Sequence, residues 1–242
     1  MKSIAFDSGP IITLSLNNLL WLIPLLKEQY KGDFLISEAV RKELVDHPLN
    51  KTKRYVLEAL NILKLITEGY LNVASTTKTK RVYEKLDHLA NKIFSSQDAF
   101  IKILHGGELE TIALAIAYNC EAIVIDERTT TMLIEEPRKV KERLEKKLHR
   151  KIKMDGYRAK EFQQLTKNIK VIRSAELVAV AYELGLFGKY FPQEIQALDE
   201  KFKEHLINGL LWGVKLTGCA ISEEEINRLK KKLWQENIQK TN

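Results

Sequence analysis

Five short runs of apolar residues are spaced along the chain, and amphipathic segments with helical periodicity separate them. The runs lie at residues 3–6, 34–36, 71–74, 122–125 and 169–172. Apolar runs of this length are typical of buried strands, and strands that alternate with helices favour a parallel sheet covered on both faces. The pattern therefore predicts an α/β fold with three layers, α/β/α, around a mainly parallel central sheet.

The first predicted helix is apolar enough to raise the question of a signal peptide or a membrane span. Residues 9–26 contain polar interruptions and Pro24, however, and no small-residue cleavage site follows them. We therefore expect a buried helix here and a cytoplasmic protein without a membrane span. Ser37 is expected to cap a later helix that ends at residues 46–48, because Ser is a preferred N-cap and Pro48 disfavours a continuing helix.

The domain organisation follows from where the strand pattern stops. Residues 1–186 contain every predicted strand and a charged, strand-free helical insertion at about 137–168. Residues 187–242 are predicted to form a C-terminal helical extension, and Ser222 and Glu225 have the spacing of a capping box that opens its last helix. The apolar residues of this extension must be covered by the core or by a second subunit, as in a homodimer. They include Leu206, Leu210, Val214 and Ile221.

The composition is that of an ordinary globular protein, with 45% apolar residues and only 11 Gly and 5 Pro. Cys120 and Cys219 stand far apart without the spacing of metal ligands. We interpret both as reduced core residues.

Positive charge is concentrated in one block. Residues 138–153 hold nine Lys or Arg against two Glu, a net charge of +7 that equals the net charge of the whole chain. A block of one sign favours the phosphate backbone of a nucleic acid, and a solvated helix face is the alternative interpretation. A membrane surface is disfavoured because the block lacks an aromatic and Leu-rich face. The candidate contacts in the block are Lys139, Lys146, Lys147 and Arg150.

Two predicted strands end in an acid. Asp7 follows the first strand and Asp126 follows the fourth. Side chains from separate strands converge at the carboxyl edge of an open parallel sheet, so the two carboxylates are expected to lie near each other. Asp is also a common residue at strand ends and turns, and the pair becomes informative only together with further acids.

Glu43 is the first of these further acids. On a helical wheel at about 100° per residue, Glu43 falls in the apolar arc of Val40 and Leu44. A carboxylate on a buried stripe needs a partner, and a salt bridge and a ligand-binding role are both consistent with it.

Three more carboxylates are expected near the same edge. Glu108 and Glu110 stand in the first turn of a helix that Gly106 and Gly107 open and that ends near Asn119, and Glu127 follows Asp126. First-turn Glu residues ordinarily complement the helix dipole. The body of this helix is apolar all round, however, so its acidic tip is expected at the sheet edge.

Converging carboxylates repel one another unless a cation or protons lie among them. Oxygen ligands without His or Cys favour Mg²⁺ or Mn²⁺, the ions that activate water in phosphoryl chemistry. The candidate metal ligands are Asp7, Glu43, Glu108, Glu110, Asp126 and Glu127.

In order and spacing, four segments of the chain resemble the PIN-domain ribonuclease family: 6–12, 37–44, 107–115 and 125–128. Residues 175–186 are similar to the closing helix of one branch of that family. The resemblance covers about the first 186 residues, the insertion excepted. Each motif alone is weak, and the ordered set is fairly specific.

The resemblance implies a small α/β/α domain that hydrolyses single-stranded RNA by water activated on Mg²⁺ or Mn²⁺. By motif, Asp7 matches the first acid, Glu43 the second and Asp126 the acid after the fourth strand, while the third is Glu108 or Glu110. Many relatives carry the last acid two residues further on, where this chain has Arg128, so Glu127 is expected to share or replace the role of Asp126. Ser8 and Arg128 adjoin the matched acids and join the nucleic-acid-binding candidates.

A metal-dependent endoribonuclease is therefore the first prediction. A catalytically inactive PIN-like RNA-binding or assembly protein is the alternative, and a protein partner such as an antitoxin is left open. An Asp-nucleophile phosphatase is disfavoured, because residues 7–9 lack the second acid that such enzymes use as a general acid.

Overall fold

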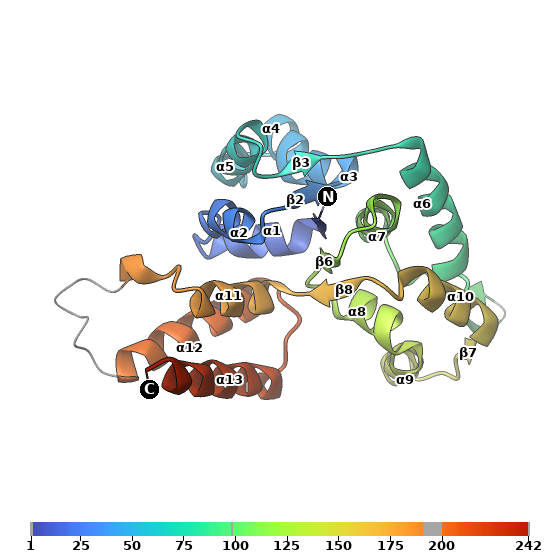
Figure 1. The fold of residues 1–242 in the computed structure, drawn as a ribbon. Coiled ribbons are helices and arrows are strands. Elements are labelled where there is room, and N and C mark those ends of the chain that lie inside the picture. The colour runs from blue at the N-terminus through green and yellow to red at the C-terminus, as the bar shows by residue number, and fades with distance from the viewer. Residues whose placement is uncertain (1, 98, 191–199, 242) are drawn as a thin grey trace.

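The centre of the molecule is a five-stranded sheet in the order β3-β2-β1-β6-β8 (Figure 1). The computed structural model describes residues 2–97, 99–190 and 200–241. The strands of the central sheet are β1 Ser3–Phe6, β2 Asp33–Ile36, β3 Asn72–Val73, β6 Ala122–Val124 and β8 Lys170–Ile172. All four strand pairings are parallel, and each strand overlaps the run predicted for it. The predicted parallel sheet is confirmed.

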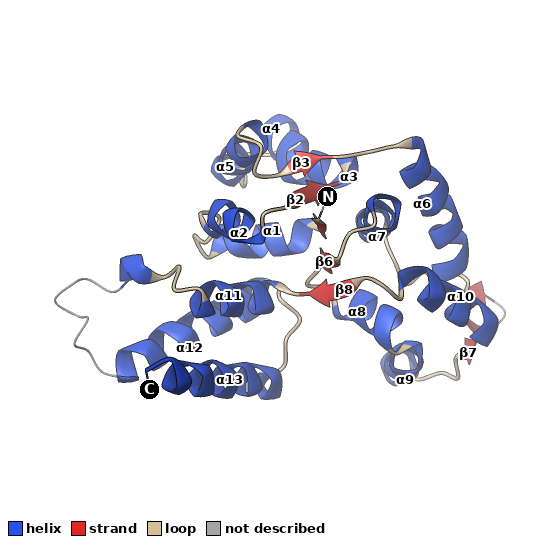
Figure 2. Ribbon diagram, in the orientation of Figure 1, coloured by secondary structure: helices blue, strands red, loops and turns tan. Residues whose placement is uncertain are grey.

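Helices cover both faces of this sheet and complete the three predicted layers (Figure 2). Successive residues of β1 point to opposite faces, so Ile4 and Phe6 pack in one hydrophobic cluster and Ala5 in another. The first cluster includes residues of α1 Ser8–Leu16, α2 Leu22–Tyr30, α5 Val56–Thr67 and α11 Ser174–Glu183. The second includes residues of α6 Thr77–Ala90, α7 Gly106–Tyr118, α8 Arg128–Glu135 and α10 Gly156–Thr166.

A second, antiparallel sheet lies outside this pattern. Its strands are β4 Phe94–Ser96, β5 Ala99–Phe100 and β7 Lys153–Met154, in the order β5-β4-β7. Strand β7 falls inside the insertion, between α9 Pro137–Leu148 and α10, so the prediction of a strand-free insertion was wrong. Strands of two or three residues are too short to produce a recognisable alternation.

The helix that Ser37 opens is longer and less regular than predicted. Ser37 is the N-cap, because its Oγ accepts a hydrogen bond from the amide of Val40. The helix does not end at residues 46–48, however. It runs from α3 Glu38–Arg41 through a π-helical turn, η1 Lys42–Asp46, into α4 His47–Lys51. Pro48 lies in the first turn of α4, where a missing amide hydrogen costs little.

The predicted helix within residues 9–26 is in fact two helices, α1 and α2. Asn17 terminates α1, and its side-chain amide donates hydrogen bonds to the carbonyl of Thr13 and to Oγ1 of Thr217. Asn18 then adopts a left-handed conformation with φ 55°. Asn tolerates this conformation better than most residues, and it turns the chain between the two helices.

The C-terminal extension packs onto the rest of the molecule. Its helices α12 Glu200–Thr217 and α13 Glu223–Thr241 contact α11, and α12 also contacts α1 (Figure 1). Val214 and Ile221 belong to the same hydrophobic cluster as β1, so the core supplies their cover. The predicted capping box is present, because the amide of Ser222 donates to Glu225 and the amide of Glu225 donates to Ser222.

Two further features complete the description. A short 3-10 turn, η2 Gly188–Tyr190, follows α11, and the parts of the predicted extension at 191–199 and 242 lie outside the described residues. Among the described helices, none has the length and apolar character that crossing a membrane requires.

Candidate functional site

Asp7 lies at the carboxyl end of β1 and is the N-cap of α1, where its Oδ2 accepts a hydrogen bond of 3.4 Å from the amide of Gly9. Its side chain is buried, and Oγ1 of the fully buried Thr111 lies 3.4 Å from its Oδ1. Burial raises the pKa of Asp7 to about 6, and the negative charge of Glu43 adds to the rise, while hydrogen bonds from the amides of Gly9 and Ser8 and from Thr111 oppose it. Asp7 is thus held charged at neutral pH at a cost in free energy.

Glu108 faces Asp7 from the first turn of α7. Its Oε2 accepts a 2.7 Å hydrogen bond from the amide of His105, which fixes the carboxylate beside the helix N-terminus. Burial raises the pKa of Glu108 to about 7, the His105 hydrogen bond opposes this rise, and the charges of Asp7, Glu127 and Glu43 add to it. Glu108 therefore belongs to the same electrostatic group as Asp7 and Glu43.

Glu43 is exposed, so the prediction that it lies on a buried stripe was wrong. The reason is the π-helical turn, in which the amide of His47 bonds to the carbonyl of Lys42, five residues earlier. This wider turn rotates the following side chains away from the positions that a regular wheel assigns, and such turns are frequent at functional sites.

The carboxylates of Glu43 and Asp7 both lie near Gly107. A β-carbon built on Gly107 would be 3.9 Å from Oε2 of Glu43 and 4.0 Å from Oδ1 of Asp7. A side chain at position 107 would therefore begin within contact distance of both acids.

Within the described part of the chain, these acids lack a positive partner. Of the ion pairs between described residues, none includes Asp7, Glu43, Glu108 or Glu127. A group of carboxylates with uncompensated charge, of which Asp7 and Glu108 have raised pKa values, suits a divalent cation with oxygen ligands. In the part of the chain that the structure describes, no three acidic, His or Cys side chains stand close enough to hold one ion, so binding requires side chains of the group to move closer together.

Glu110, the other candidate for the third acid, points elsewhere. Its Oε2 accepts a 3.1 Å hydrogen bond from the amide of Ala39, at the start of α3. It lines a separate pocket with Lys42 and Tyr83. The structure therefore groups Glu108, and not Glu110, with Asp7.

Asp126 has a network of its own. Its Oδ1 accepts a 2.8 Å hydrogen bond from the amide of Ser174, and its Oδ2 accepts bonds of 2.9 Å from the hydroxyls of Ser174 and Thr13. Burial raises the pKa of the nearby Cys219 thiol to about 12, and the charge of Asp126 adds to this rise. The side chain of Asp126 thus joins β6 to α1, α11 and the C-terminal extension.

Sequence reasoning gave no role to Thr13, Thr111 or Ser174, and it interpreted Cys219 only as a reduced core residue. Thr111 stands four residues after Gly107 on an otherwise apolar helix, and Ser174 begins a helix directly after a strand. A buried hydroxyl in either position is a usable signal, because it needs a hydrogen-bond partner.

Glu127 and Arg128 follow Asp126 on the surface. Glu127 caps α8 by accepting a 3.0 Å hydrogen bond from the amide of Thr129. Its negative charge also helps to raise the pKa of Glu108. Arg128 forms an ion pair of 3.5 Å with Glu225 of α13. Arg128 therefore contacts the extension.

The remaining nucleic-acid-binding candidates are scattered. Ser8 is buried in the first turn of α1. Lys139 pairs with Glu136 at 2.9 Å, and Arg150 donates to the side chain of Gln97, while Lys146 and Lys147 are exposed in the last turn of α9. Figure 1 shows α9 beyond α8, on the side of α8 away from β1 and β6.

Comparison with known proteins gives one match. A family model described as a PIN domain matches residues 3–136, more than half of the 242-residue chain. The matched region runs from β1 to the end of α8, and it includes the whole acidic group but neither α9 nor the C-terminal extension. No curated protein and no solved structure matches the chain.

Proposed function

The chain belongs to the PIN-domain family, and from this premise we propose that it is a metal-dependent endoribonuclease that cleaves single-stranded RNA. PIN domains are in general nucleases, and they typically use divalent metal ions. The observation that carries the proposal is the group formed by Asp7, Glu43 and Glu108, whose charges have no positive partner among the described residues. Glu127 adjoins this group.

In this proposal Asp7, Glu43 and Glu108 hold Mg²⁺ or Mn²⁺. Such an ion, when bound, lowers the pKa of water and neutralises charge that develops on a phosphate. Asp7 is oriented by Thr111 and by the amide of Gly9, and Glu108 is oriented by the amide of His105. With a pKa of about 7, Glu108 is also able to hold or release a proton near neutral pH. The positive block on α9 is proposed to attract RNA from a distance.

Divalent-ion affinity is expected to depend strongly on pH. A protonated carboxyl is a poor cation ligand, and the pKa values of Asp7 and Glu108 are raised to about 6 and about 7. Affinity for Mn²⁺ should therefore rise as pH increases from about 5 to about 8, and reach a plateau above the higher pKa. Calorimetric titration at several pH values measures this, and an affinity that is constant between about pH 5 and pH 8 would contradict the assignment.

Cleavage of a labelled single-stranded RNA tests the proposed activity, with Gly107→Ala and Gly106→Ala as a matched pair. Both replacements favour the helix, since Ala has a higher helix propensity than Gly. The Gly107 methyl would contact the carboxylates of Glu43 and Asp7, whereas the nearest atom to a Gly106 methyl is the Tyr83 hydroxyl at 3.9 Å. We expect Gly106→Ala to retain Mn²⁺-dependent cleavage and Gly107→Ala to lose most of it. Cleavage that persists in a chelator, or equal rates for the two variants, would count against the proposal.

One observation favours a second function, that of an inactive PIN-like RNA-binding or assembly protein. The described residues contain no preformed group of three metal-binding side chains, and Asp126 is committed to its own hydrogen bonds. This alternative predicts RNA binding without cleavage in Mn²⁺, which the same assay detects.

A further inference from the structure

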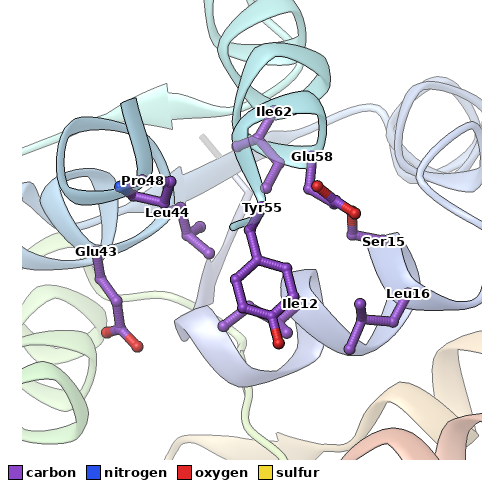
Figure 3. A pocket seen from close by; sticks show the side chains of 9 residues that line it. All are labelled: Ile12, Ser15, Leu16, Glu43, Leu44, Pro48, Tyr55, Glu58 and Ile62. Carbon is purple, nitrogen blue, oxygen red and sulfur yellow. The ribbon is translucent and has the colours of Figure 1, made fainter. Parts of the chain in front are cut away.

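A small apolar cavity opens directly beside Glu43. Its volume is about 280 Å³, and it is enclosed by α1, the turn η1 with α4, and α5. Figure 3 shows the Tyr55 ring projecting into the middle of this cavity, with Glu43 on one side and Leu16 on the other. The lining is mostly apolar and includes Ile12, Leu44 and Ile62, while Ser15 and Glu58 supply polar atoms. The cavity thus adjoins the acidic group and differs from it in chemistry.

An exposed basic segment, the 51–55 loop, runs from the last residue of α4 to Tyr55, which lines this cavity. It carries Lys51, Lys53 and Arg54, all of them exposed, and Tyr55 follows directly. Of the ion pairs between described residues, none includes these three cations. The guanidinium of Arg54 lies 5.5 Å from the centroid of the Tyr55 ring. The 51–55 loop therefore presents positive charge and an aromatic ring at one place.

We propose that this cavity and the 51–55 loop bind one nucleobase and the adjacent phosphates of a single-stranded RNA, next to the acidic group. The proposal rests on the proposed function, because RNA is the substrate in both. The subsite proposal goes beyond the proposed function in two ways. It assigns a binding site outside the acidic group, and it places the direct RNA contact on the 51–55 loop, while α9 only attracts RNA from a distance.

The chemistry of the subsite favours a base over an apolar peptide side chain. Proteins that hold single strands combine aromatic rings, on which bases stack, with cations that follow the backbone. A cavity of about 280 Å³ is just below the roughly 300–1,000 Å³ typical of ligand pockets, which suits a single planar ring system. The three cations of the 51–55 loop, which form no ion pair with another described residue, would add nothing to the binding of an apolar side chain, but they match phosphates.

The backbone at Tyr55 supports a role for this side chain. Tyr55 has φ 62° and ψ 20°, a left-handed conformation that bulky side chains rarely adopt. Its side chain is 48% exposed, so burial does not explain the choice of an aromatic residue there. Strained conformations of this kind are concentrated at functional sites. Asn is several-fold enriched in the left-handed region, so Tyr55→Asn should relieve strain while removing the ring.

The test measures RNA binding in a chelator, so that metal-dependent cleavage does not contribute. Short single-stranded RNAs carry the fluorescent base 2-aminopurine at one position each, because stacking on a ring quenches its emission. The wild-type chain should quench at one position, and Tyr55→Phe should do the same. We expect Tyr55→Asn to abolish the quenching and to raise Tm. It should also lower RNA affinity about tenfold, because a tenfold loss corresponds to about 1.4 kcal/mol, which lies within the range for stacking of one base.

Charge variants separate the loop from α9. The loop variant combines Lys51→Gln, Lys53→Gln and Arg54→Gln, and the α9 variant combines Lys139→Gln, Lys146→Gln, Lys147→Gln and Arg150→Gln. Each phosphate contact on a single strand contributes about −0.7 to the slope of log affinity against log salt, so the loop variant should flatten the slope by about 2. The α9 variant should keep the quenching at saturating RNA.

The outcomes are distinct. Unchanged quenching, affinity and salt slope in both Tyr55→Asn and the loop variant would overturn the subsite, even if wild-type protein cleaves RNA in Mn²⁺. Absence of RNA binding by the wild-type chain, with apolar peptides binding at the cavity instead, would overturn it as well. If base quenching is observed and cleavage in Mn²⁺ is not, the subsite stands and the proposed nuclease activity fails.

Discussion

Replacing Asp7 with Asn is expected to stabilise the metal-free protein by about 3 kcal/mol at about pH 8, and to abolish RNA cleavage. Burial and the charge of Glu43 raise the pKa of Asp7 from 3.8 to about 6. One pKa unit corresponds to about 1.4 kcal/mol, so a charged Asp7 lowers the free energy of unfolding by about twice that amount. Asn is also a good N-cap residue, so α1 keeps its cap.

The sign of the effect is tested by its pH dependence. A carboxyl whose pKa is raised on folding costs no stability below the unfolded value of 3.8, and its full cost is reached above the folded value of about 6. The two proteins should therefore differ little near about pH 4 and diverge as pH rises. Denaturant unfolding in a chelator at several pH values measures this. An Asp7→Asn protein that is less stable than the wild type at about pH 8 would contradict the account.

Replacing Asp126 with Ala is expected to have the opposite effect, a loss of at least about 3 kcal/mol of stability. The carboxylate of Asp126 accepts three hydrogen bonds, and a hydrogen bond to a charged group contributes about 1.5–3 kcal/mol. The hydroxyls of Thr13 and Ser174 are buried, with exposed fractions of 1% and 0%, so the variant leaves them without an acceptor.

Urea unfolding of Asp126→Ala and Asp126→Asn measures this second effect. The Asn variant keeps a carbonyl oxygen for the amide of Ser174, so it should fall between the wild type and Asp126→Ala. If Asp126→Ala is as stable as the wild type, the hydrogen bonds of Asp126 to Thr13 and Ser174 do not stabilise the fold. Asp7 and Asp126, at the ends of neighbouring strands, are thus expected to contribute to stability with opposite signs: Asp7 destabilises the metal-free protein and Asp126 stabilises it.

Much of the fold was predictable because its signals are local. The five parallel strands are nearly continuous apolar runs, since both faces of the sheet are covered. Ser37, Asn119 and Ser222 mark helix ends through hydrogen bonds within a few residues of themselves. Patterns of this kind are visible in a single sequence, because the capping residue and the backbone group that it bonds lie within one helical turn of each other.

The predictions that failed depend on the geometry of the whole chain. A wheel at about 100° per residue assumes a regular helix, and the π-helical turn at η1 breaks that assumption and exposes Glu43. Glu108 and Glu110 stand two residues apart, so they point to nearly opposite sides of α7. Only the packing of α7 decides that Glu108 faces Asp7 while Glu110 caps α3.

The roles of Asp7 and Asp126 could not be separated from the sequence either. Both follow an apolar strand, and both are buried. Their difference comes from distant partners: Ser174 is 48 residues from Asp126, and Thr13 is 113 residues from it. No local pattern contains this information, so the motif match alone treats the two acids as equivalent.

A calorimetric Mn²⁺ titration at about pH 8 tests the central claim most directly, that Asp7 is a ligand in a metal site that excludes Glu110. The comparison uses the wild type, Asp7→Asn and Glu110→Gln, because the Gln carbonyl can still accept the hydrogen bond from Ala39. We expect the wild type and Glu110→Gln to bind Mn²⁺ with similar affinity and Asp7→Asn to lose binding. Undetectable binding by the wild type, or unchanged affinity in Asp7→Asn, would contradict the account.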